Sequence, residues 1–203
     1  LYAGLQALKN RTKTKPPVTF RVIKTHSLPE PAYYKRAIYI YRDGRDSVLS
    51  YYHFNRRFNN YKGTFLDFLK TEDNFLASLG TSGAPCRSWA EHVQAWMASK
   101  LPFPVHYVKY EKLKKDTFLE LSQILAFLNL ERADWQIRQA IESADFSLLK
   151  KNEMAKVGAL KDENMFFFRS GKAGQWREYF TEEHINIFKK EAYETLLTLS
   201  YSE

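Results

Sequence analysis

Three short stretches of the sequence combine residue types that bind anions or move protons. In the first stretch, Arg42 follows a run of apolar residues, and Ser50 lies eight positions later, one helical turn beyond Asp46. A guanidinium, a hydroxyl and the partial positive charge at the start of a helix together favour a phosphate. The alternative, a surface arginine and an unrelated helix serine, stays open on these residues alone.

The second stretch places Lys24 and His26 two positions apart at the end of an apolar run. On an extended backbone both side chains would face the same side. A histidine can take a proton from a hydroxyl near neutral pH, and a neighbouring lysine can stabilise developing negative charge. A structural or merely exposed histidine is the alternative.

The third stretch, residues 166–177 (FFFRSGKAGQWR), carries Gly171 and Gly174 among three basic residues. Glycines at such positions let the backbone approach an anion closely. Their spacing is neither that of a Walker A loop nor that of a Rossmann fingerprint. The stretch therefore predicts either an anion-binding loop or a flexible basic connector.

The hydrophobic pattern indicates which elements hold these stretches. It predicts strands at residues 18–23, 37–41 and 105–108, and helices at residues 1–9, 46–54, 64–79, 87–99, 117–128, 131–143 and 181–199. The expected helix caps are Asp46 or Ser47, Thr117 and Thr181. Strands separated by such helices imply a parallel sheet with helices on both faces, in one α/β domain covering residues 1–203. Ligands of these sheets bind just after the strands.

Composition narrows the class of partner. The 203 residues include 31 Lys and Arg against 23 Asp and Glu, a formal net charge of +8, so an anionic partner is expected: nucleic acid, a phosphorylated nucleotide or a polyanionic sugar. The single cysteine, Cys86, excludes a disulfide within the chain and a multi-cysteine zinc site, and it fits a reducing, cytoplasmic compartment. No apolar run approaches the ~20 residues of a membrane-spanning helix.

Taken together, the stretches resemble the cytosolic-type sulfotransferases, which use 3′-phosphoadenosine-5′-phosphosulfate (PAPS). The resemblance runs in order from residue 20 to about residue 185. It rests on residues 24–29 (KTHSLP), 41–54 (YRDGRDSVLSYYHF), 89–96 (WAEHVQAW), 110–114 (YEKLK) and 167–176 (FFRSGKAGQW). It implies an α/β, three-layer fold like that of the P-loop NTPases, with a central parallel sheet flanked by helices.

The resemblance also implies a role for particular residues. His26 would be the general base that deprotonates the acceptor, and Lys24 would contact the transferring sulfuryl group or the bridging oxygen. The residues implied to bind the nucleotide are Arg42, Ser50, Arg169, Ser170 and Gly171 at the 3′-phosphate, Tyr110 at the adenine edge and Phe146 stacked on the adenine. The reaction would be an in-line displacement that leaves 3′,5′-adenosine bisphosphate (PAP) and needs no metal. The acceptor would be a hydroxyl, or an amine, of a small or lipid-like molecule.

Several positions depart from the family pattern. Ser170 stands where the family usually has lysine, and Ala144 stands where a threonine commonly touches the adenine. Glu182 replaces the valine of the family's short dimer motif, so the usual dimer contact is not expected and the oligomeric state stays open. The family's N-terminal strand and its loop resembling Tyr-Pro-Lys-Ser-Gly-Thr-Thr-Trp have no counterpart here. We therefore expect that this chain lacks an N-terminal stretch of the native protein.

Two other functions remain as alternatives. A nucleic-acid-binding module would use the same basic surface with interleaved aromatic residues, but it would need them along one continuous face. Here they gather at strand ends and in one glycine loop, so we expect no nucleic acid. An inactive relative would keep the nucleotide site without turnover.

Overall fold

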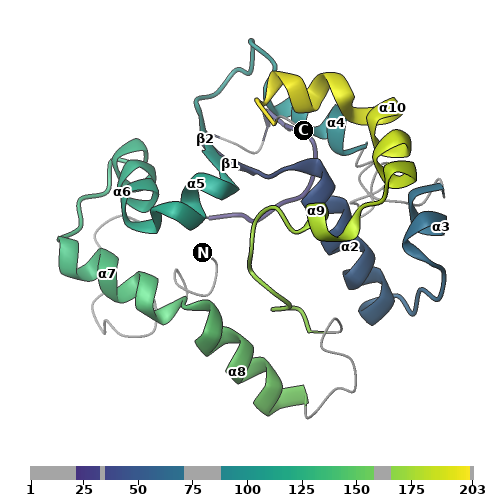
Figure 1. Ribbon diagram of the computed structural model, residues 1–203. Coiled ribbons are helices and arrows are strands. Elements are labelled where there is room, and N and C mark those ends of the chain that lie inside the picture. The colour runs from purple at the N-terminus through teal and green to yellow at the C-terminus, as the bar shows by residue number, and fades with distance from the viewer. Residues whose placement is uncertain (1–21, 33–34, 71–87, 158–165, 202–203) are drawn as a thin grey trace. The chain divides into compact units, whose positions relative to one another are not determined.

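The computed structural model describes residues 22–32, 35–70, 88–157 and 166–201 (Figure 1). The chain divides into two compact units. The helical unit consists of Leu1–Thr25 and Lys112–Gly171, and the sheet unit consists of His26–Glu111 and Lys172–Glu203. The single domain expected over residues 1–203 stays a prediction.

The sheet unit is built around two parallel strands, β1 (Ala37–Tyr41) and β2 (Val105–Lys109). Their register runs from Ala37 paired with Val105 to Tyr41 paired with Lys109. The strand predicted at residues 37–41 is confirmed, and the one predicted at 105–108 is a residue longer. Parallel strands need a long crossover connection. Here the crossover carries α2 (Gly44–Phe58), α3 (Phe65–Lys70) and α4 (Trp89–Trp96).

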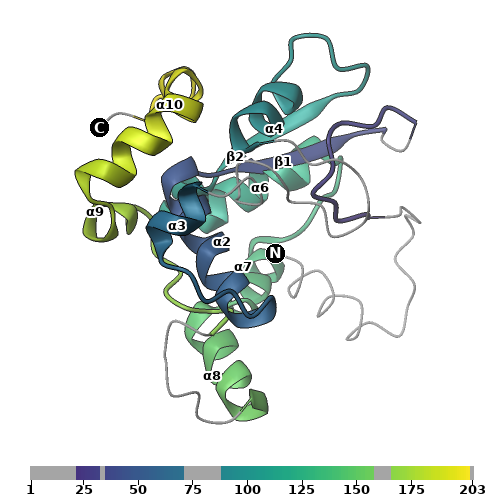
Figure 2. The same ribbon diagram turned by 90° about the vertical axis from the view of Figure 1, so that its right-hand side faces the viewer.

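One face of β1 packs against α4, as Figure 2 shows. Tyr39 is buried on that face and stacks on Trp96, with ring centroids 5.2 Å apart and planes within 9°. Phe103 completes this small cluster. Ile38 and Ile40 alternate with Tyr39 and are exposed, as the two-residue period of a strand requires.

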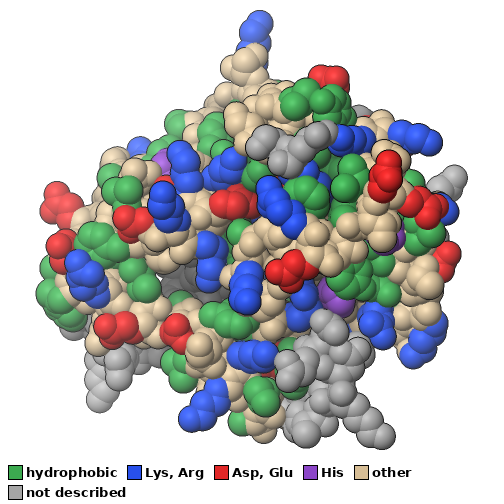
Figure 3. Space-filling model, in the orientation of Figure 1, with side chains coloured by type: hydrophobic (Ala, Val, Ile, Leu, Met, Phe, Trp, Pro, Cys, Tyr) green, Lys and Arg blue, Asp and Glu red, His purple; other side chains and the backbone are tan. Residues whose placement is uncertain are grey.

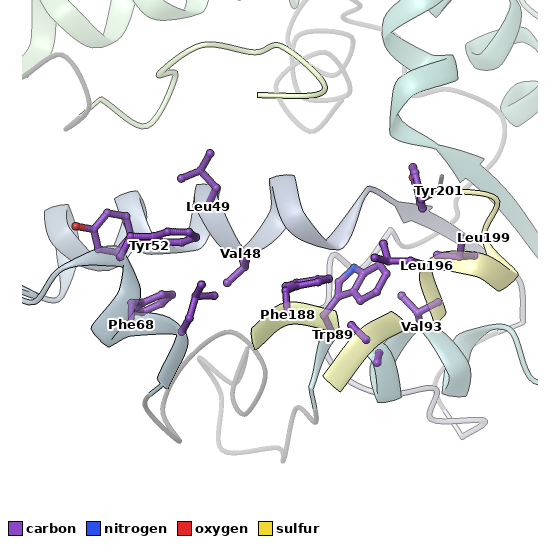
Figure 4. Close-up of a cluster of buried hydrophobic side chains, with 14 residues drawn as sticks. Val48, Leu49, Tyr52, Phe68, Trp89, Val93, Phe188, Leu196, Leu199 and Tyr201 are labelled. Atoms are coloured by element: carbon purple, nitrogen blue, oxygen red, sulfur yellow. The ribbon is translucent and has the colours of Figure 1, made fainter. Parts of the chain in front are cut away.

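The main hydrophobic core lies between α2, α3, α4 and α10 (Glu182–Thr198), as Figure 4 shows. Val48 from α2 and Phe188 from α10 are almost completely buried at its centre. Aromatic rings from α2 and α3 pack together nearby, with 5.5 Å between the centroids of Tyr52 and Phe68. This core holds α2 in place, and only Arg42 and Asp43 separate α2 from β1.

In the sheet unit, one cap prediction was wrong and one is confirmed. Asp43 caps α2, because its carboxylate accepts the N–H of Arg45, so the expectation of Asp46 or Ser47 was wrong. The side chain of Asp46 is fully buried and accepts other donors, described below. Thr181 caps α10 as predicted, with His184 as its capping-box partner.

The helical unit contains α6 (Thr117–Phe127), α7 (Asp134–Ser143) and α8 (Phe146–Val157). α6 packs against α7, and the Arg138 guanidinium lies 4.5 Å from the Phe118 ring centroid. α6 is capped by Asp116 and not by Thr117, whose hydroxyl donates to the Leu113 carbonyl instead. α7 begins three residues later than predicted. The sequence pattern did not predict α8, α5 (Tyr110–Lys115) or α9 (Trp176–Tyr179).

Some expectations lie outside the described residues. These are the helix at residues 1–9, the strand at 18–21, the helix at 71–79 and Cys86. Val22 and Ile23 are described and belong to no strand, so the strand expected at 18–23 does not extend over them. None of the helices in the described ranges combines the length and apolar character that crossing a bilayer requires.

Candidate functional site

The predicted site residues are distributed over both units. The sheet unit holds His26, Arg42, Ser50 and Tyr110, and the helical unit holds Lys24, Phe146, Arg169, Ser170 and Gly171. Within each unit, some of these residues come together and others do not.

Arg42 and Tyr110 come together at the carboxyl ends of the two strands. Because Tyr41 pairs with Lys109, the residues that follow them leave the sheet side by side. The Arg42 guanidinium lies over the Tyr110 ring, with its Cζ 4.6 Å from the ring centroid. Burial raises the pKa of Tyr110, although the positive charge of Arg42 opposes this effect. The pair places a cation and an aromatic face where ligands of parallel sheets bind.

Asp46 holds Arg42 and the glycine loop (residues 172–175) together. Its fully buried carboxylate accepts a hydrogen bond from Nη2 of Arg42, with 3.1 Å between the two atoms. Its two oxygens also accept the backbone N–H groups of Gly174 at 2.6 Å and Trp176 at 3.0 Å. Arg42 Nη2 in turn donates to the Lys172 carbonyl at 2.8 Å. One side chain therefore fixes the end of β1, the start of α2 and the loop that precedes α9.

A second connection between α2 and α9 runs through Arg45. Its Nε and Nη2 donate to the Asp43 carboxylate at 3.0 and 2.8 Å, in a fork that is almost fully buried. Its guanidinium lies on Trp176, with Cζ 3.6 Å from the ring centroid. Asp43 thus caps the helix and neutralises this buried cation.

Glu111 connects the turn after β1 with the residues that follow α10. One carboxylate oxygen accepts the backbone N–H of Asp43 at 3.2 Å, and the other accepts the Tyr201 hydroxyl at 2.8 Å. Burial and the bond to Glu111 raise the pKa of Tyr201, so its hydroxyl remains protonated and donates. Glu111 thereby fixes the backbone directly after Arg42, while the pairing of Tyr41 with Lys109 fixes the backbone before it.

Arg42 keeps donors that could serve an anion. Its Nε is buried and has no hydrogen-bond partner among the described residues. Ser50 is exposed on α2, one turn beyond Asp46. The sequence singled out both residues, but it gave Asp46 only a capping role and missed Glu111. The four-residue spacing of Arg42 and Asp46 was the one local signal for their ion pair.

In the helical unit, Phe146 and Gly171 come together. Gly171 has a φ of +63°, and a Cβ built there would lie 2.6 Å from the Phe146 ring. The Glu153 carboxylate accepts the backbone N–H groups of Phe167 and Phe168, both at 2.9 Å. The segment that carries Arg169 and Ser170 is therefore held at two points. Glu153 of α8 binds the residues before it, and the Phe146 ring contacts Gly171 after it.

Lys24 and His26 both lie in irregular backbone, and both side chains are exposed. Their side-chain exposure makes each accessible to a molecule from solution. The Ser27 carbonyl next to His26 accepts hydrogen bonds from α4.

Two further features of the protein are the distribution of charged side chains on its surface and the grouping of possible metal ligands. Lys and Arg side chains occur at many places on the face that Figure 3 shows, with Asp and Glu between them. In the part of the chain that the structure describes, no three His, Cys, Asp or Glu side chains group so that they could hold a metal ion.

Comparison of the sequence with known proteins gives consistent matches. The sulfotransferase-domain family model matches residues 6–199. Sulfotransferase 1B1 of Mus musculus is 30% identical over 212 residues, which cover 96% of this chain and 67% of that protein. Sulfotransferase 1A1 of Bos taurus is 31% identical over 182 residues, which cover 83% of this chain and 59% of that protein.

Solved structures are similar as well. Mouse sulfotransferase SULT7A1, complexed with PAP, aligns with a TM-score of 0.58 and 27% identity, over 81% of this chain and 60% of that one. Retinol dehydratase, in a complex with retinol and PAP, aligns with a TM-score of 0.68 and 28% identity, over 96% of this chain and 60% of that one. These likenesses confirm the predicted α/β fold class with its parallel sheet.

The chain spans about three fifths to two thirds of the length of these four proteins. The family model, by contrast, covers nearly the whole of this chain, including the strand ends, α2 and the glycine loop. The chain therefore belongs to the sulfotransferase-domain family.

Proposed function

We propose that the protein transfers a sulfuryl group from PAPS to a hydroxyl, or an amine, of a small or lipid-like acceptor. Family membership supports this proposal, as do the PAP complexes of SULT7A1 and retinol dehydratase. The observation that carries it is the arrangement around Asp46, where Arg42, Tyr110 and the glycine loop are positioned at the ends of parallel strands.

The residues present suit a 3′-phosphoadenosine group. Arg42 is already oriented through Nη2 and retains a buried Nε–H that lacks an acceptor among the described residues, so binding a phosphate costs little side-chain ordering. Ser50, Arg169, Ser170 and Gly171 would supply further donors, from side chains and from the backbone. Tyr110 and Phe146 would contact the adenine.

His26 and Lys24 would act at the reacting centre. When bound, PAPS supplies an activated sulfuryl group, and PAP is its leaving group. His26 takes the proton of the acceptor hydroxyl while the acceptor oxygen forms a bond to sulfur. The bond between sulfur and the 5′-phosphate oxygen breaks, and its electron pair leaves with PAP. Lys24 stabilises the negative charge that develops on that oxygen.

The acceptor we propose is an apolar alcohol. Retinol dehydratase has been solved with retinol and with androsterone, and these complexes support this choice. The net charge of +8 matches a donor that carries several negative charges, and it does not require a charged acceptor.

The test combines binding and turnover in the complete gene product. Calorimetry with PAP is expected to give one site per chain. An assay with radiolabelled PAPS and a panel of phenols, sterols, retinoid alcohols and amines is expected to label at least one acceptor. Absence of PAP binding would reject the nucleotide site, and PAP binding without transfer to any acceptor would favour an inactive relative. Salt-sensitive RNA or DNA binding that PAP does not compete would favour a nucleic-acid-binding module.

A further inference from the structure

The backbone directly after His26 is attached to α4 by two side chains. The Ser27 carbonyl oxygen accepts Nε1–H of Trp96 at 3.0 Å and also lies 3.3 Å from Nε2 of His92. Both donors come from the same face of α4, one turn apart. The carbonyl oxygen thus uses both of its lone pairs.

The contacts of His92 determine which ring nitrogen carries the proton. A carbonyl oxygen can only accept, so Nε2 must be the protonated nitrogen that donates to Ser27. In the neutral ring, Nδ1 is then an acceptor, and the Tyr39 hydroxyl lies 3.0 Å from it. The imidazole therefore bridges β1 and the segment that carries His26, with one defined tautomer.

The surroundings of His92 keep this arrangement in place near pH 7. Burial is the largest effect and lowers the pKa of His92, and the charge of the nearby His26 lowers it further. Hydrogen bonds to the backbone of Ser27 and His26 oppose this shift. The ring of Tyr39, which lies on β1 next to His92, also stacks on Trp96. This stacking restricts the position of the Tyr39 hydroxyl.

We propose that His92 is a positioning residue: its imidazole fixes the Ser27 carbonyl and thereby the backbone from which His26 reaches the acceptor. This inference rests on the proposed function, because it assumes that His26 is the general base. A base displaced by about 1 Å loses roughly 10²-fold in rate. The contact to Ser27 therefore influences turnover without any contact between His92 and the nucleotide.

The main experiment compares three variants of the complete gene product. His92→Leu removes both ring nitrogens, whereas His92→Gln retains a donor that can reach the position of Nε2. Trp96→Phe removes the other donor to Ser27 and keeps an aromatic ring. We expect His92→Leu to lower kcat about 30- to 100-fold, with the KM for PAPS and the Kd for PAP within about threefold of the parent. His92→Gln should recover most of the loss, and Trp96→Phe should fall between the two.

A second readout does not depend on turnover. Hydrogen exchange of the peptide covering residues 22–32 is expected to become at least about tenfold faster in His92→Leu and to return towards the parent rate in His92→Gln. This measurement still decides the inference if the parent transfers no sulfate or if His26→Ala remains active, either of which would count against the proposed function instead. Should His92→Leu fail to fold, His92→Gln and Trp96→Phe provide the same comparison.

Three results would overturn the inference. One is parent-like kcat in His92→Leu when His26→Ala is inactive. Another is an equal loss of kcat and PAP affinity, which would indicate general damage to the fold. The third is unchanged exchange of residues 22–32 in a folded His92→Leu variant.

Discussion

The backbone N–H of Gly174 donates to Oδ2 of Asp46 at 2.6 Å, although 128 positions separate the two residues. The same oxygen accepts Nη2 of Arg42. The glycine loop and the arginine therefore share one buried acceptor.

Asp46→Asn is expected to destabilise the protein and to weaken PAP binding. The amide keeps one acceptor, loses the ion pair with Arg42 and brings an N–H₂ group against existing donors. Breaking a buried pair in this way costs about 3 kcal/mol of unfolding free energy. Urea unfolding and calorimetry with PAP measure the two effects. The exposed carboxylate of Glu182 at the start of α10 offers a control, since Glu182→Gln should change both quantities little. If Asp46→Asn and Glu182→Gln had the same unfolding free energy and the same affinity for PAP, Asp46 would not stabilise the positions of Arg42 and the glycine loop.

Arg42→Ala is expected to weaken PAP binding by about 2 to 3 kcal/mol if a charge-assisted hydrogen bond is lost. This corresponds to a Kd about 30- to 140-fold higher. Arg42→Lys should recover little, because an ammonium cannot donate to Asp46, the Lys172 carbonyl and a phosphate in one plane. Arg132→Ala, at an exposed arginine before α7, is the matched loss of charge and should leave the Kd nearly unchanged. Calorimetry that found the same Kd for Arg42→Ala and the parent would remove Arg42 from the site.

His26→Ala is expected to abolish sulfate transfer and to leave the Kd for PAP nearly intact, because the exposed imidazole is assigned to the acceptor and not to the nucleotide. His184→Ala is an informative comparison, since His184 closes the capping box of α10. That change should lower the unfolding free energy by about 1 kcal/mol and preserve turnover. A His26→Ala protein that turned over at the parent rate would exclude His26 as the base.

Gly171→Ala is expected to impair PAP binding more than Gly174→Ala. Both residues have positive φ, 63° and 79°, so each alanine costs about 1 to 2 kcal/mol of backbone strain. Only at position 171 does the new methyl group also meet an aromatic ring, that of Phe146 at 2.6 Å. At position 174 the nearest atom is the flexible end of Arg177, at 3.2 Å. Equal PAP affinity of the two variants would show that the Phe146–Gly171 contact is irrelevant to binding.

The unfolding free energy should decrease as the pH falls below about 6.5. Burial lowers the pKa values of His92 and His184. His92 lies near His26 and Tyr39. For His184, the charge of Glu183 opposes the lowering of the pKa, and the charge of Lys70 adds to it. The two histidines of the unfolded chain then bind protons at a higher pH than those of the folded chain. Their contribution to the unfolding free energy is therefore complete above the unfolded pKa of 6.5. It is lost as the pH falls through the pKa values of the folded chain. Urea unfolding at pH 7.5, 6.5 and 5.5 measures the slope.

His92→Gln should make that slope shallower, because one of the two histidines no longer titrates. Identical slopes for the variant and the parent would mean that protonation of His92 does not contribute to stability.

The strands β1 and β2 and the helices α2, α6 and α10 were predictable because their signals are local, whereas α8 was not predicted. Alternating branched and aromatic residues located β1 to the residue, and Thr181 marked the start of α10. The cap of α2 was not predictable in the same way, because Asp43, Asp46 and Ser47 are all acceptable caps by type. The choice is decided by Gly174 and Trp176, distant donors that occupy the Asp46 carboxylate.

The candidate site was predictable in part for the same reason. Arg42 and Tyr110 followed from strand ends and family motifs, and the structure brings their side chains together. Glu111 and His92 carried no distinguishing local pattern, since a glutamate in a basic helix and a histidine on an amphipathic helix usually have no special role. Their importance lies in partners more than 60 positions away, such as Asp43 for Glu111 and Ser27 for His92.

The double use of Glu111 suggests a coevolving pair. The Tyr201 hydroxyl donates a hydrogen bond to the Glu111 carboxylate and depends on this acceptor. The backbone N–H of position 43 donates to the other oxygen of Glu111, and it would do so with any side chain at that position. Replacement of Tyr201 by phenylalanine would leave one oxygen of the partly buried Glu111 without this donor, whereas the same replacement accompanied by Glu111→Gln would be tolerated better. A double-mutant cycle would measure this interdependence, and homologous sequences should vary at the two positions together.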